Sequence, residues 1–236
     1  MGPVTAVLLA GGQGTRAGSA TSKQFLDLAG RPVLVHSLLV FEATPEVTSV
    51  VLVLPDVVPD FIREAIALPK VVSVTTGGQV RQASLAEGLA CLPEETEVVV
   101  VHDAARPLVS PDLVGASLAA LPDWDGVVAA VPVEDAVKEV SSTSEILRAR
   151  TRSGLWRAQT PQVFVREVLE DALARADAEG VVADDCSELA TRVGYRVRVV
   201  PGDLWNLKVT RPQDLALCER IIESRGAAPW LERATR

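Results

Sequence analysis

The stretch VTAVLLAGGQGTR, residues 4–16, joins an apolar run to a loop that holds three glycines. The run Val4 to Leu9 is apolar at almost every position, which is typical of a strand buried on both faces of a parallel sheet. The glycines after it let backbone N–H groups approach a bound group closely. Because ligands of open parallel sheets bind outside the carboxyl ends of the strands, this stretch predicts both a fold class and the edge at which a ligand site lies.

Similar apolar runs recur along the chain and alternate with segments of helical spacing. The expected strands are Val4 to Leu9, Ser49 to Leu54, Val71 to Val74, Val98 to Val101, Gly126 to Val131 and Arg196 to Val200. Apolar residues three or four positions apart predict helices. Such spacing occurs at Leu85, Leu89 and Leu92, and over Val165 to Ala178, Asp185 to Val193 and Pro212 to about Glu223. The alternation predicts an α/β fold, Rossmann-like and three-layered, with a mainly parallel sheet between two layers of helices.

The alternation breaks at residues 134–155, which we call the arm. Residues 134–152, EDAVKEVSSTSEILRARTR, hold two short segments of alternating polarity around a Ser- and Thr-rich turn, which predicts a protruding β-hairpin. An isolated hairpin is marginally stable in water at best. We therefore expect a second copy of the chain to cover the arm, as a homodimer. Residues 1–236 are expected to form one domain that carries this arm.

Charge and composition exclude several classes of protein. The chain has 23 Lys and Arg against 31 Asp and Glu, a formal net charge of −8, so a general nucleic-acid or anionic-membrane binder is not expected. A hydrophobic fraction of 48% excludes a disordered chain. The three cysteines lack the spacing of a zinc site or a disulfide framework, and the first apolar run is too short and wrongly flanked for a membrane span or a signal peptide. We expect a reduced, cytoplasmic protein.

The glycine loop is a candidate phosphate cradle. Successive N–H groups at Gly11, Gly12 and Gly14 can form a concavity for phosphate oxygens. Arg16 and Lys23 place positive charge beside it, in a protein that repels anions as a whole.

Two other phosphate-binding motifs fail on spacing. The dinucleotide pattern GxGxxG/A needs an acid about 20 residues on, at the end of the next strand, and that strand ends only near Asp56. The P-loop needs Gly-Lys-Ser/Thr, whereas Lys23 stands between Ser22 and Gln24.

Further chemistry-bearing segments follow other predicted strands. VHDAARP, residues 101–107, puts Asp103 and Arg106 at the carboxyl edge of the sheet, where the carboxylate could hold a hydroxyl group or Mg²⁺, or where the two could merely tie down a loop. His102 is interpreted as structural, because no Ser or Cys nucleophile motif accompanies it. GGQVRQAS, residues 77–84, offers glycines and a helix start for close contact with a flat base or a ribose.

The ordered motifs together carry a family resemblance. LAGGQGTR followed by KQF, then GGQVRQAS, VHDAARP, PVEDAVK, TPQ and NLKVTRPQDL, over about residues 4–218, resemble the 2-C-methyl-D-erythritol 4-phosphate cytidylyltransferases. The resemblance implies a nucleotidyltransferase fold and a reaction in which CTP and methylerythritol phosphate give CDP-methylerythritol and pyrophosphate, in non-mevalonate isoprenoid synthesis. It also implies Mg²⁺ and a homodimer whose arm reaches into the neighbouring active site.

The resemblance also implies roles for individual residues. Nucleotide binding would fall on Ala10, Gly11, Gly12, Gly14, Gly78, Gln79 and Ser84. The catalytic group would be Arg16, Lys23, Arg152 and Lys208. Arg16 and Lys23 would stabilise the transition state. Lys208, together with Arg152 from the partner's arm, would hold the sugar phosphate. Asp103, Arg106 and Thr160 would bind the same phosphorylated substrate, and no metal-ligating residue is assigned. Taken alone, Arg152 and Lys208 read as ordinary surface charges.

Two positions depart from the family's pattern and keep alternatives open. The family usually has Thr where this chain has Ala136, and often Thr where it has Ala183, so two hydroxyl contacts to the substrate would be missing. The nearest alternative is a cytidylyltransferase for another sugar-alcohol phosphate, such as ribitol 5-phosphate. An NAD-dependent dehydrogenase is disfavoured because Asp56, the acidic residue after the next strand, comes too far along the sequence for the dinucleotide pattern. A catalytically silent interaction protein would bind no CTP.

Overall fold

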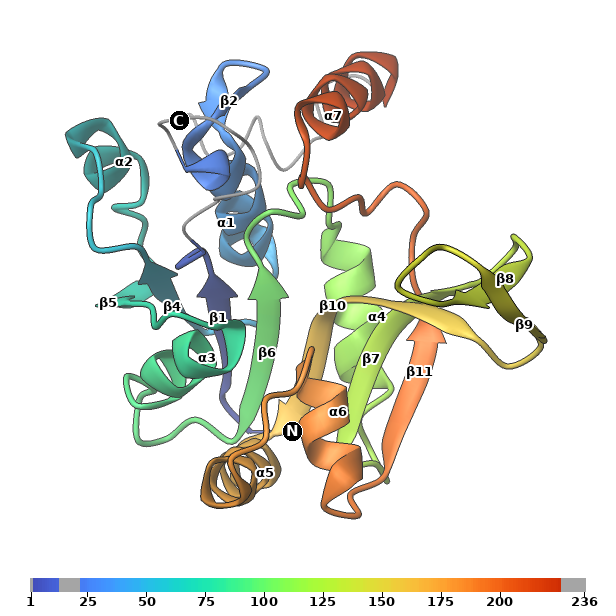
Figure 1. Ribbon diagram of the computed structural model, residues 1–236. Helices are drawn as coiled ribbons and strands as arrows, with labels where there is room; N and C mark the ends of the chain where they lie inside the picture. Colours follow the sequence, from blue (N-terminus) through green and yellow to red (C-terminus); the bar gives the residue numbers. More distant parts are fainter. Residues whose placement is uncertain (1, 13–21, 226–236) are drawn as a thin grey trace.

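The computed structural model describes residues 2–12 and 22–225, which are organised around one seven-stranded sheet (Figure 1). In spatial order its strands are β11 (Val197–Pro201), β7 (Gly126–Pro132), β10 (Trp156–Val165), β6 (Val98–Asp103), β1 (Val4–Leu9), β4 (Ser49–Leu54) and β5 (Val71–Thr76). Neighbouring strands run parallel except that β10 is antiparallel to both β6 and β7. The predicted α/β class with a mainly parallel sheet is confirmed.

Helices cover both faces of this sheet. One face packs against α1 (Val33–Ala43), α2 (Asp60–Ala65) and α4 (Pro111–Ala119), and the other against α3 (Arg81–Leu89), α5 (Arg166–Glu179) and α6 (Cys186–Arg192). Within β1, Ala6 and Leu8 face the first set, whereas Val7 and Leu9 face the second. Because each central strand is buried on both sides, its residues are apolar without alternation, which is the pattern that the sequence displays.

A smaller cluster lies above the carboxyl edge of the sheet. Here α7 (Pro212–Arg225) packs near the short strands β2 (Asp27–Leu28) and β3 (Arg31–Pro32), and Leu28, Val33, Val209 and Cys218 are buried between them. None of the helices in the described part of the chain is long and apolar enough to cross a membrane.

The arm contains the predicted hairpin. Strands β8 (Val137–Val140) and β9 (Ile146–Arg150) pair with each other in a separate two-stranded sheet that projects from the body (Figure 1). Glu139 on β8 forms ion pairs with Arg148 and Arg150 on β9. Every residue of β9 is exposed in the single chain, so the hairpin has little packing of its own.

Strand β10 is the strand of the seven-stranded sheet that the sequence did not predict. We expected the arm to end near residue 155 and a helix to begin at Val165, and the structure places a ten-residue strand between them in the middle of the sheet. Pro161 has no N–H to donate, which argues against a central strand. The sheet accommodates it because the pairing of β10 with β7 shifts register between Ala158 and Gln162.

The loops after the central strands meet at one edge of the sheet. Ala10 N donates to Val53 O at 2.8 Å, Gly77 N donates to Leu54 O at 2.8 Å, and Ala104 N donates to Leu9 O at 3.0 Å. These bonds tie together the segments that follow β1, β4, β5 and β6, at the upper edge of the sheet in Figure 1.

Candidate active site

A cleft of about 170 Å³ lies at this carboxyl edge. It is lined by Leu9, Ala10, Gly11, Gly12, Lys23, Gln24, Gly78, Gln79, Val80, Arg81, Ser84, Asp103, Ala105 and Lys208. The lining comes from five separate regions of the sequence, and it joins the glycine loop, residues 23–24, the GGQVRQAS segment, the end of β6 and the segment before α7. Nine residues singled out from the sequence lie in it: Ala10, Gly11, Gly12, Lys23, Gly78, Gln79, Ser84, Asp103 and Lys208.

Two glycine segments form the floor of the cleft and touch each other. A Cβ atom on Gly11 would lie 3.0 Å from the Cα of Gly77, and one on Gly77 would lie 2.9 Å from the Cα of Gly11 and 2.8 Å from Ser84 Oγ. A side chain at either position would force the two loops apart, so glycine is required here by close approach of backbone to backbone. Ser84 Oγ in turn donates to Gly78 O at 3.3 Å and helps to hold the second loop.

The glycine loop is also held from the other side by Gln24. This residue belongs to the short 3₁₀ helix η2 (Lys23–Phe25), and its amide donates to Ala10 O at 2.7 Å and to Gly12 O at 3.2 Å. Its side chain is buried, so these bonds fix the direction in which the loop leaves β1. Lys23, the preceding residue, lines the cleft. Gly14 and Arg16 lie outside the described residues.

Asp103 ends β6 between two cations. Its carboxylate accepts from Arg81 Nε at 3.1 Å and from Lys208 Nζ at 2.7 Å. Burial by itself would raise the pKa of this carboxyl, but the charges of Arg81 and Lys208 outweigh it and hold the pKa well below its usual range. Asp103 is therefore ionised at any ordinary pH, and the three side chains together carry one net positive charge.

Arg81 is a site residue that sequence reasoning missed. It is the first residue of α3, lines the cleft, and donates through Nη1 to Cys186 Sγ at 3.5 Å. Burial would lower its pKa, but Cys186 and Asp103 outweigh burial and raise it, so the guanidinium stays charged. The signal was available, because an arginine three residues after a glycine pair at the end of a strand starts a helix beside the ligand edge.

Arg106 and Thr160 lie behind the cleft and not on its described lining. Arg106 Nη1 donates to Asn206 O at 2.8 Å, and Thr160 Oγ1 contacts His102 Nδ1 at 2.9 Å and accepts from Asp103 N at 3.1 Å. Thr160 and Asn206 are buried. Their hydrogen bonds hold the end of β6, which carries Asp103.

Arg152 lies apart from the cleft of its own chain. It is exposed near the base of the arm and donates to the backbone oxygen of Glu134. The structure of one chain thus brings together nine of the predicted residues, sets two directly behind them, and leaves Arg152 on the arm.

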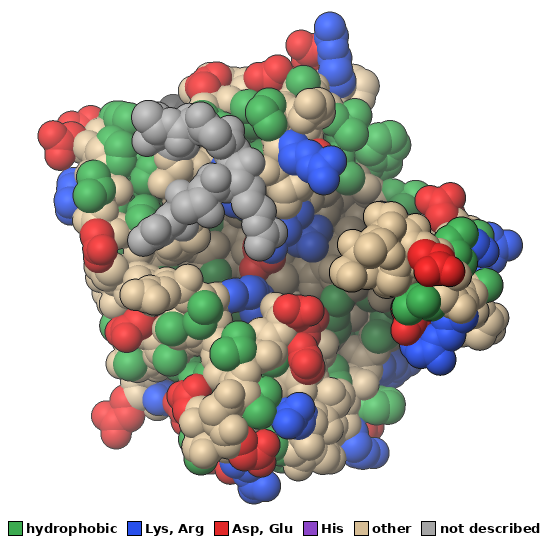
Figure 2. Space-filling model, in the orientation of Figure 1, with side chains coloured by type: hydrophobic (Ala, Val, Ile, Leu, Met, Phe, Trp, Pro, Cys, Tyr) green, Lys and Arg blue, Asp and Glu red, His purple; other side chains and the backbone are tan. Residues whose placement is uncertain are grey.

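Positive charge is concentrated around the cleft. Its described lining carries Lys23, Arg81 and Lys208 against one carboxylate, Asp103, although the chain as a whole has a net charge of −8. Figure 2 shows Lys and Arg side chains near the middle of this face, around a hollow between the body and the arm. Such a site attracts an anionic ligand that the remaining surface would repel.

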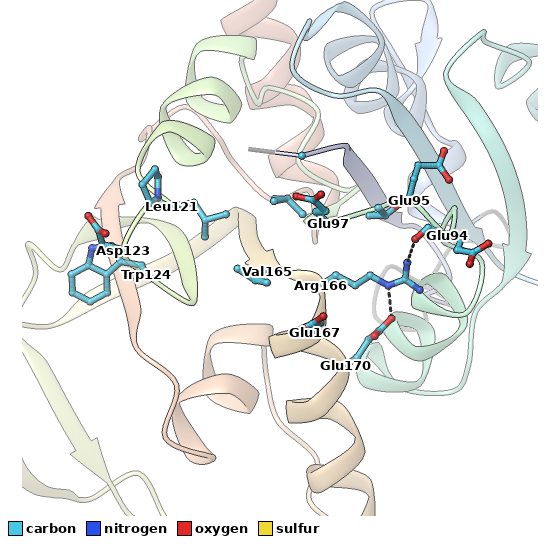
Figure 3. Close-up of a pocket in the computed structure, with 14 residues that line it drawn as sticks. Glu94, Glu95, Glu97, Leu121, Asp123, Trp124, Val165, Arg166, Glu167 and Glu170 are labelled. Atoms are coloured by element: carbon cyan, nitrogen blue, oxygen red, sulfur yellow. Dashed lines mark hydrogen bonds and ion pairs between the residues drawn. The ribbon is translucent and has the colours of Figure 1, made fainter.

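A larger cavity, about 1050 Å³, lies at the opposite edge of the sheet. Figure 3 shows the acidic side chains that surround it, with Arg166 in contact with Glu94 and Glu170. Its described lining holds six carboxylates and one arginine. A phosphate group would be repelled there, and the amino ends of parallel strands are not where ligands of such sheets bind. The larger cavity is therefore not the candidate site, and the charge of the lining favours the smaller cleft at the carboxyl edge.

Comparison with known proteins gives a consistent match. The family model for 2-C-methyl-D-erythritol 4-phosphate cytidylyltransferase matches residues 4–224. A relative with this name from Pelotomaculum thermopropionicum is 38% identical over 229 residues, which cover 95% of this chain and 96% of the relative. Another, from Symbiobacterium thermophilum, is 40% identical over 222 residues, which cover 94% and 93%.

A solved structure agrees with these sequence matches. The crystal structure of 2-C-methyl-D-erythritol 4-phosphate cytidylyltransferase from Thermus thermophilus is similar with a TM-score of 0.75 at 31% identity, and the match covers 92% of this chain and 98% of that one. Sequence and fold agree over almost the full length of each protein. This chain belongs to the 2-C-methyl-D-erythritol 4-phosphate cytidylyltransferase family.

Proposed function

We propose that this chain transfers the cytidylyl group of CTP to 2-C-methyl-D-erythritol 4-phosphate, with release of pyrophosphate. The observation that carries the proposal is the cleft in which two glycine loops face Lys23, Arg81 and Lys208 at the carboxyl edge of a parallel sheet. Such a cleft suits a nucleoside triphosphate, because close backbone can follow the base and phosphates while the cations offset their charge. Family membership supports the identity of the two substrates.

The chemistry needs no general base. The nucleophile is an oxygen of a phosphate monoester, which is already ionised near neutral pH. It forms a bond to the α-phosphorus of CTP as the bond from that phosphorus to the bridging oxygen of pyrophosphate breaks, and pyrophosphate leaves with the electron pair. What must be overcome is the repulsion between two anions, so catalysis consists of charge neutralisation and alignment.

The proposed roles divide the cleft into a nucleotide side and an acceptor side, the acceptor being the sugar phosphate. On the nucleotide side, the groups are Ala10, Gly11, Gly12, Gly14, Gly78, Gln79 and Ser84, with Arg16 and Lys23 at the reacting phosphoryl group. On the acceptor side, they are Asp103, Arg106, Thr160 and Lys208, joined by Arg152. Arg81 lies between the two sides, because its backbone continues the GGQ loop while its guanidinium holds Asp103.

We propose that Mg²⁺ takes part, carried mainly by the nucleotide's own phosphates. Among the described residues, no group of three His, Cys, Asp or Glu side chains is placed to hold a metal ion. Mg²⁺ usually needs only one or two carboxylates beside substrate phosphates. The one carboxylate on the described lining, Asp103, already accepts from Arg81 and Lys208, so the phosphates themselves would hold the ion. When bound, the ion would supply further neutralisation of phosphate charge.

We also propose a homodimer formed through the arm. Its large apolar side chains Val140, Ile146, Leu147 and Leu155 are exposed in the single chain, as is Trp156 beside it. A second copy would cover them and bring Arg152 to a cleft that is not its own. The three cysteines are free thiols, which suits the reducing cytoplasm in which we place the protein.

The test is pyrophosphate release with two acceptors. With CTP and Mg²⁺, we expect release that depends on methylerythritol phosphate and is much slower with ribitol 5-phosphate. Faster turnover of ribitol 5-phosphate would overturn the proposed acceptor while leaving cytidylyl transfer intact. CTP hydrolysis or inertness with both would overturn the proposed reaction.

A further inference from the structure

Four residues behind the acceptor side are joined in a closed ring of hydrogen bonds, which we call the four-residue network. His102 Nε2 bonds to Arg106 O at 3.3 Å, and Arg106 Nη1 donates to Asn206 O at 2.8 Å. Asn206 Nδ2 donates to Thr160 O at 2.8 Å, and Thr160 Oγ1 returns to His102 Nδ1 at 2.9 Å. The members come from the end of β6, the loop after it, β10 and the segment before α7.

The direction of each bond at His102 follows from its partners. A carbonyl oxygen only accepts, so Nε2 must carry the proton that goes to Arg106 O. In a neutral imidazole Nδ1 then has no proton and must accept from the Thr160 hydroxyl. The imidazole is fully buried beside the ring of Phe41, and burial lowers its pKa to about 3, so it is neutral at any assay pH.

The Thr160 hydroxyl is therefore already occupied. Its single proton goes to His102 Nδ1, and its oxygen accepts from Asp103 N at 3.1 Å. An ionised phosphate can only accept hydrogen bonds, so Thr160 could bind one only by giving up the bond to His102. The side chain is also buried, at 3% exposed, and is not on the described lining of the cleft.

The network lies next to the two charged groups of the acceptor side. His102 precedes Asp103 in β6, and Asn206 lies two residues before Lys208. Val209 N donates to Ala105 O at 2.7 Å, which holds the two segments together on the other side of Lys208. A change in the network thus shifts the Asp103–Lys208 pair, whose atoms are 2.7 Å apart.

We propose that His102 and Thr160 are positioning residues, which hold Asp103, Arg106 and Lys208 in place for the acceptor and do not bind its phosphate group. This inference rests on the proposed function, and it replaces the direct contact that the resemblance implies for Thr160. Because the nucleotide side of the cleft is built from other loops, loss of the network affects acceptor binding and leaves CTP binding nearly unchanged.

Steady-state kinetics of Thr160 and His102 variants test this. Thr160→Val keeps the branched shape and removes the hydroxyl, and we expect KM for methylerythritol phosphate to rise about tenfold or more, with KM for CTP within about twofold. Thr160→Ser restores the hydroxyl and serves as the matched control, with both constants near those of the wild type.

The His102 variants separate positioning from direct contact. His102→Leu removes both bonds, and we expect it to raise KM for the acceptor as Thr160→Val does, with the double variant no worse than about threefold beyond either. His102→Asn and His102→Gln keep one bond each, and we expect their KM for the acceptor to lie between those of the wild type and His102→Leu. These two variants also provide the test if His102→Leu does not fold. Folded His102 variants with wild-type KM for the acceptor, or effects that multiply fully in the double variant, would overturn the proposal.

An NMR measurement keeps the test independent of the reaction. Nitrogen-15 shifts of the His102 imidazole in the wild-type protein should report a protonated Nε2 and a hydrogen-bonded Nδ1, and the Nδ1 shift should change in Thr160→Val. A protonated Nδ1 would overturn the network. Absence of turnover by the wild type would instead refute the proposed function, so the two failures are distinguishable.

Discussion

Asp103 controls how much positive charge the cleft presents. Its carboxylate is held by Arg81 at 3.1 Å and by Lys208 at 2.7 Å, so neither cation acts alone. If Lys208 were the only partner of Asp103, the pair would be neutral. Because Arg81 is also present, the three side chains keep one net positive charge beside a substrate phosphate. This is why Arg81, although it is not implied by the family resemblance, belongs to the site.

Lys23 lines the cleft and precedes Gln24, which bonds to the glycine loop, and it is the first residue to test. We expect Lys23→Ala to lose about 10²-fold or more in kcat, by analogy with removal of one preorganised transition-state donor. Arg220→Ala on α7 removes the same charge from the exposed surface and is the matched control, expected to behave as wild type. A Lys23→Ala rate within about threefold of wild type would remove Lys23 from the transition state.

The buried histidine makes folding sensitive to acid. The pKa of His102 is about 3 in the folded chain against a usual value of 6.5, so between these values the unfolded chain binds one more proton. The free energy of unfolding therefore falls as pH is lowered from 6.5 towards 3, by about 1.4 kcal/mol per pH unit from this residue. Burial also lowers the pKa of His36, which acts in the same direction.

Urea unfolding at several pH values between 4 and 7 checks this slope. His102→Gln should weaken the dependence by about 1.4 kcal/mol per pH unit, whatever its effect on stability at pH 7. An unchanged slope in this variant would show that His102 is protonated in the folded protein.

Among the structural elements, the parallel strands were predictable and β10 was not. Strands β1, β4 and β6 are buried on both faces, so their sequences are mostly apolar and stand out from the helices between them. In β10 only residues 159–164 are buried; the strand begins Trp156-Arg157 and contains Pro161, and these residues resemble an extension of the arm. Its place is set by pairing with two distant strands, which local pattern does not encode.

The candidate site was predictable to a similar extent. Glycines and charges directly after strands identified the lining of the cleft, since strand ends converge at one edge. Gln24 and Asn206 were missed as site residues, because their roles arise from contacts between segments: Gln24 with the glycine loop, and Asn206 with Arg106. Arg81 was missed although its place after a glycine pair indicates the ligand edge.

The contact between the two glycine loops gives a prediction at the level of elements. Gly77→Ala places a methyl group 2.9 Å from the Cα of Gly11, and we expect a loss of about 1–3 kcal/mol in stability together with weaker CTP binding. Gly115→Ala, in helix α4 with its nearest neighbour at 3.6 Å, is the control and should be neutral or stabilising by up to about 1 kcal/mol. Unfolding curves and CTP titration of both variants check this; unimpaired CTP binding by Gly77→Ala would show that the loops separate freely.

The arm gives a second prediction of this kind. Arg152→Ala should mainly raise KM for the acceptor, and Lys23→Ala should mainly lower kcat. In a dimer that combines one subunit of each variant, one of the two clefts has Lys23 from its own chain and Arg152 from the other. Random co-assembly should therefore restore about a quarter of the wild-type sites. Activity no higher than that of the separate variants would place the action of Arg152 within one chain.

Over the whole molecule, charge is segregated between the two edges of the sheet. The carboxyl edge carries the cationic cleft, and the amino edge carries the acidic cavity around Glu94, Glu97 and Glu170. With a net charge of −8, the protein repels anions as a whole, and the cationic cleft attracts them locally. This arrangement explains how an acidic protein can bring together two ionised substrates.

The most direct measurement is phosphorus NMR of the products formed with methylerythritol phosphate, Mg²⁺ and each of the four nucleoside triphosphates in turn. With CTP, we expect the resonances of an unsymmetrical diphosphate joining two organic groups, together with an equal amount of pyrophosphate, and much less product with ATP, GTP or UTP. A mixture containing CTP that yields no such diphosphate, or yields it no faster than the other three nucleotides do, would contradict the assignment of this cleft to cytidylyl transfer.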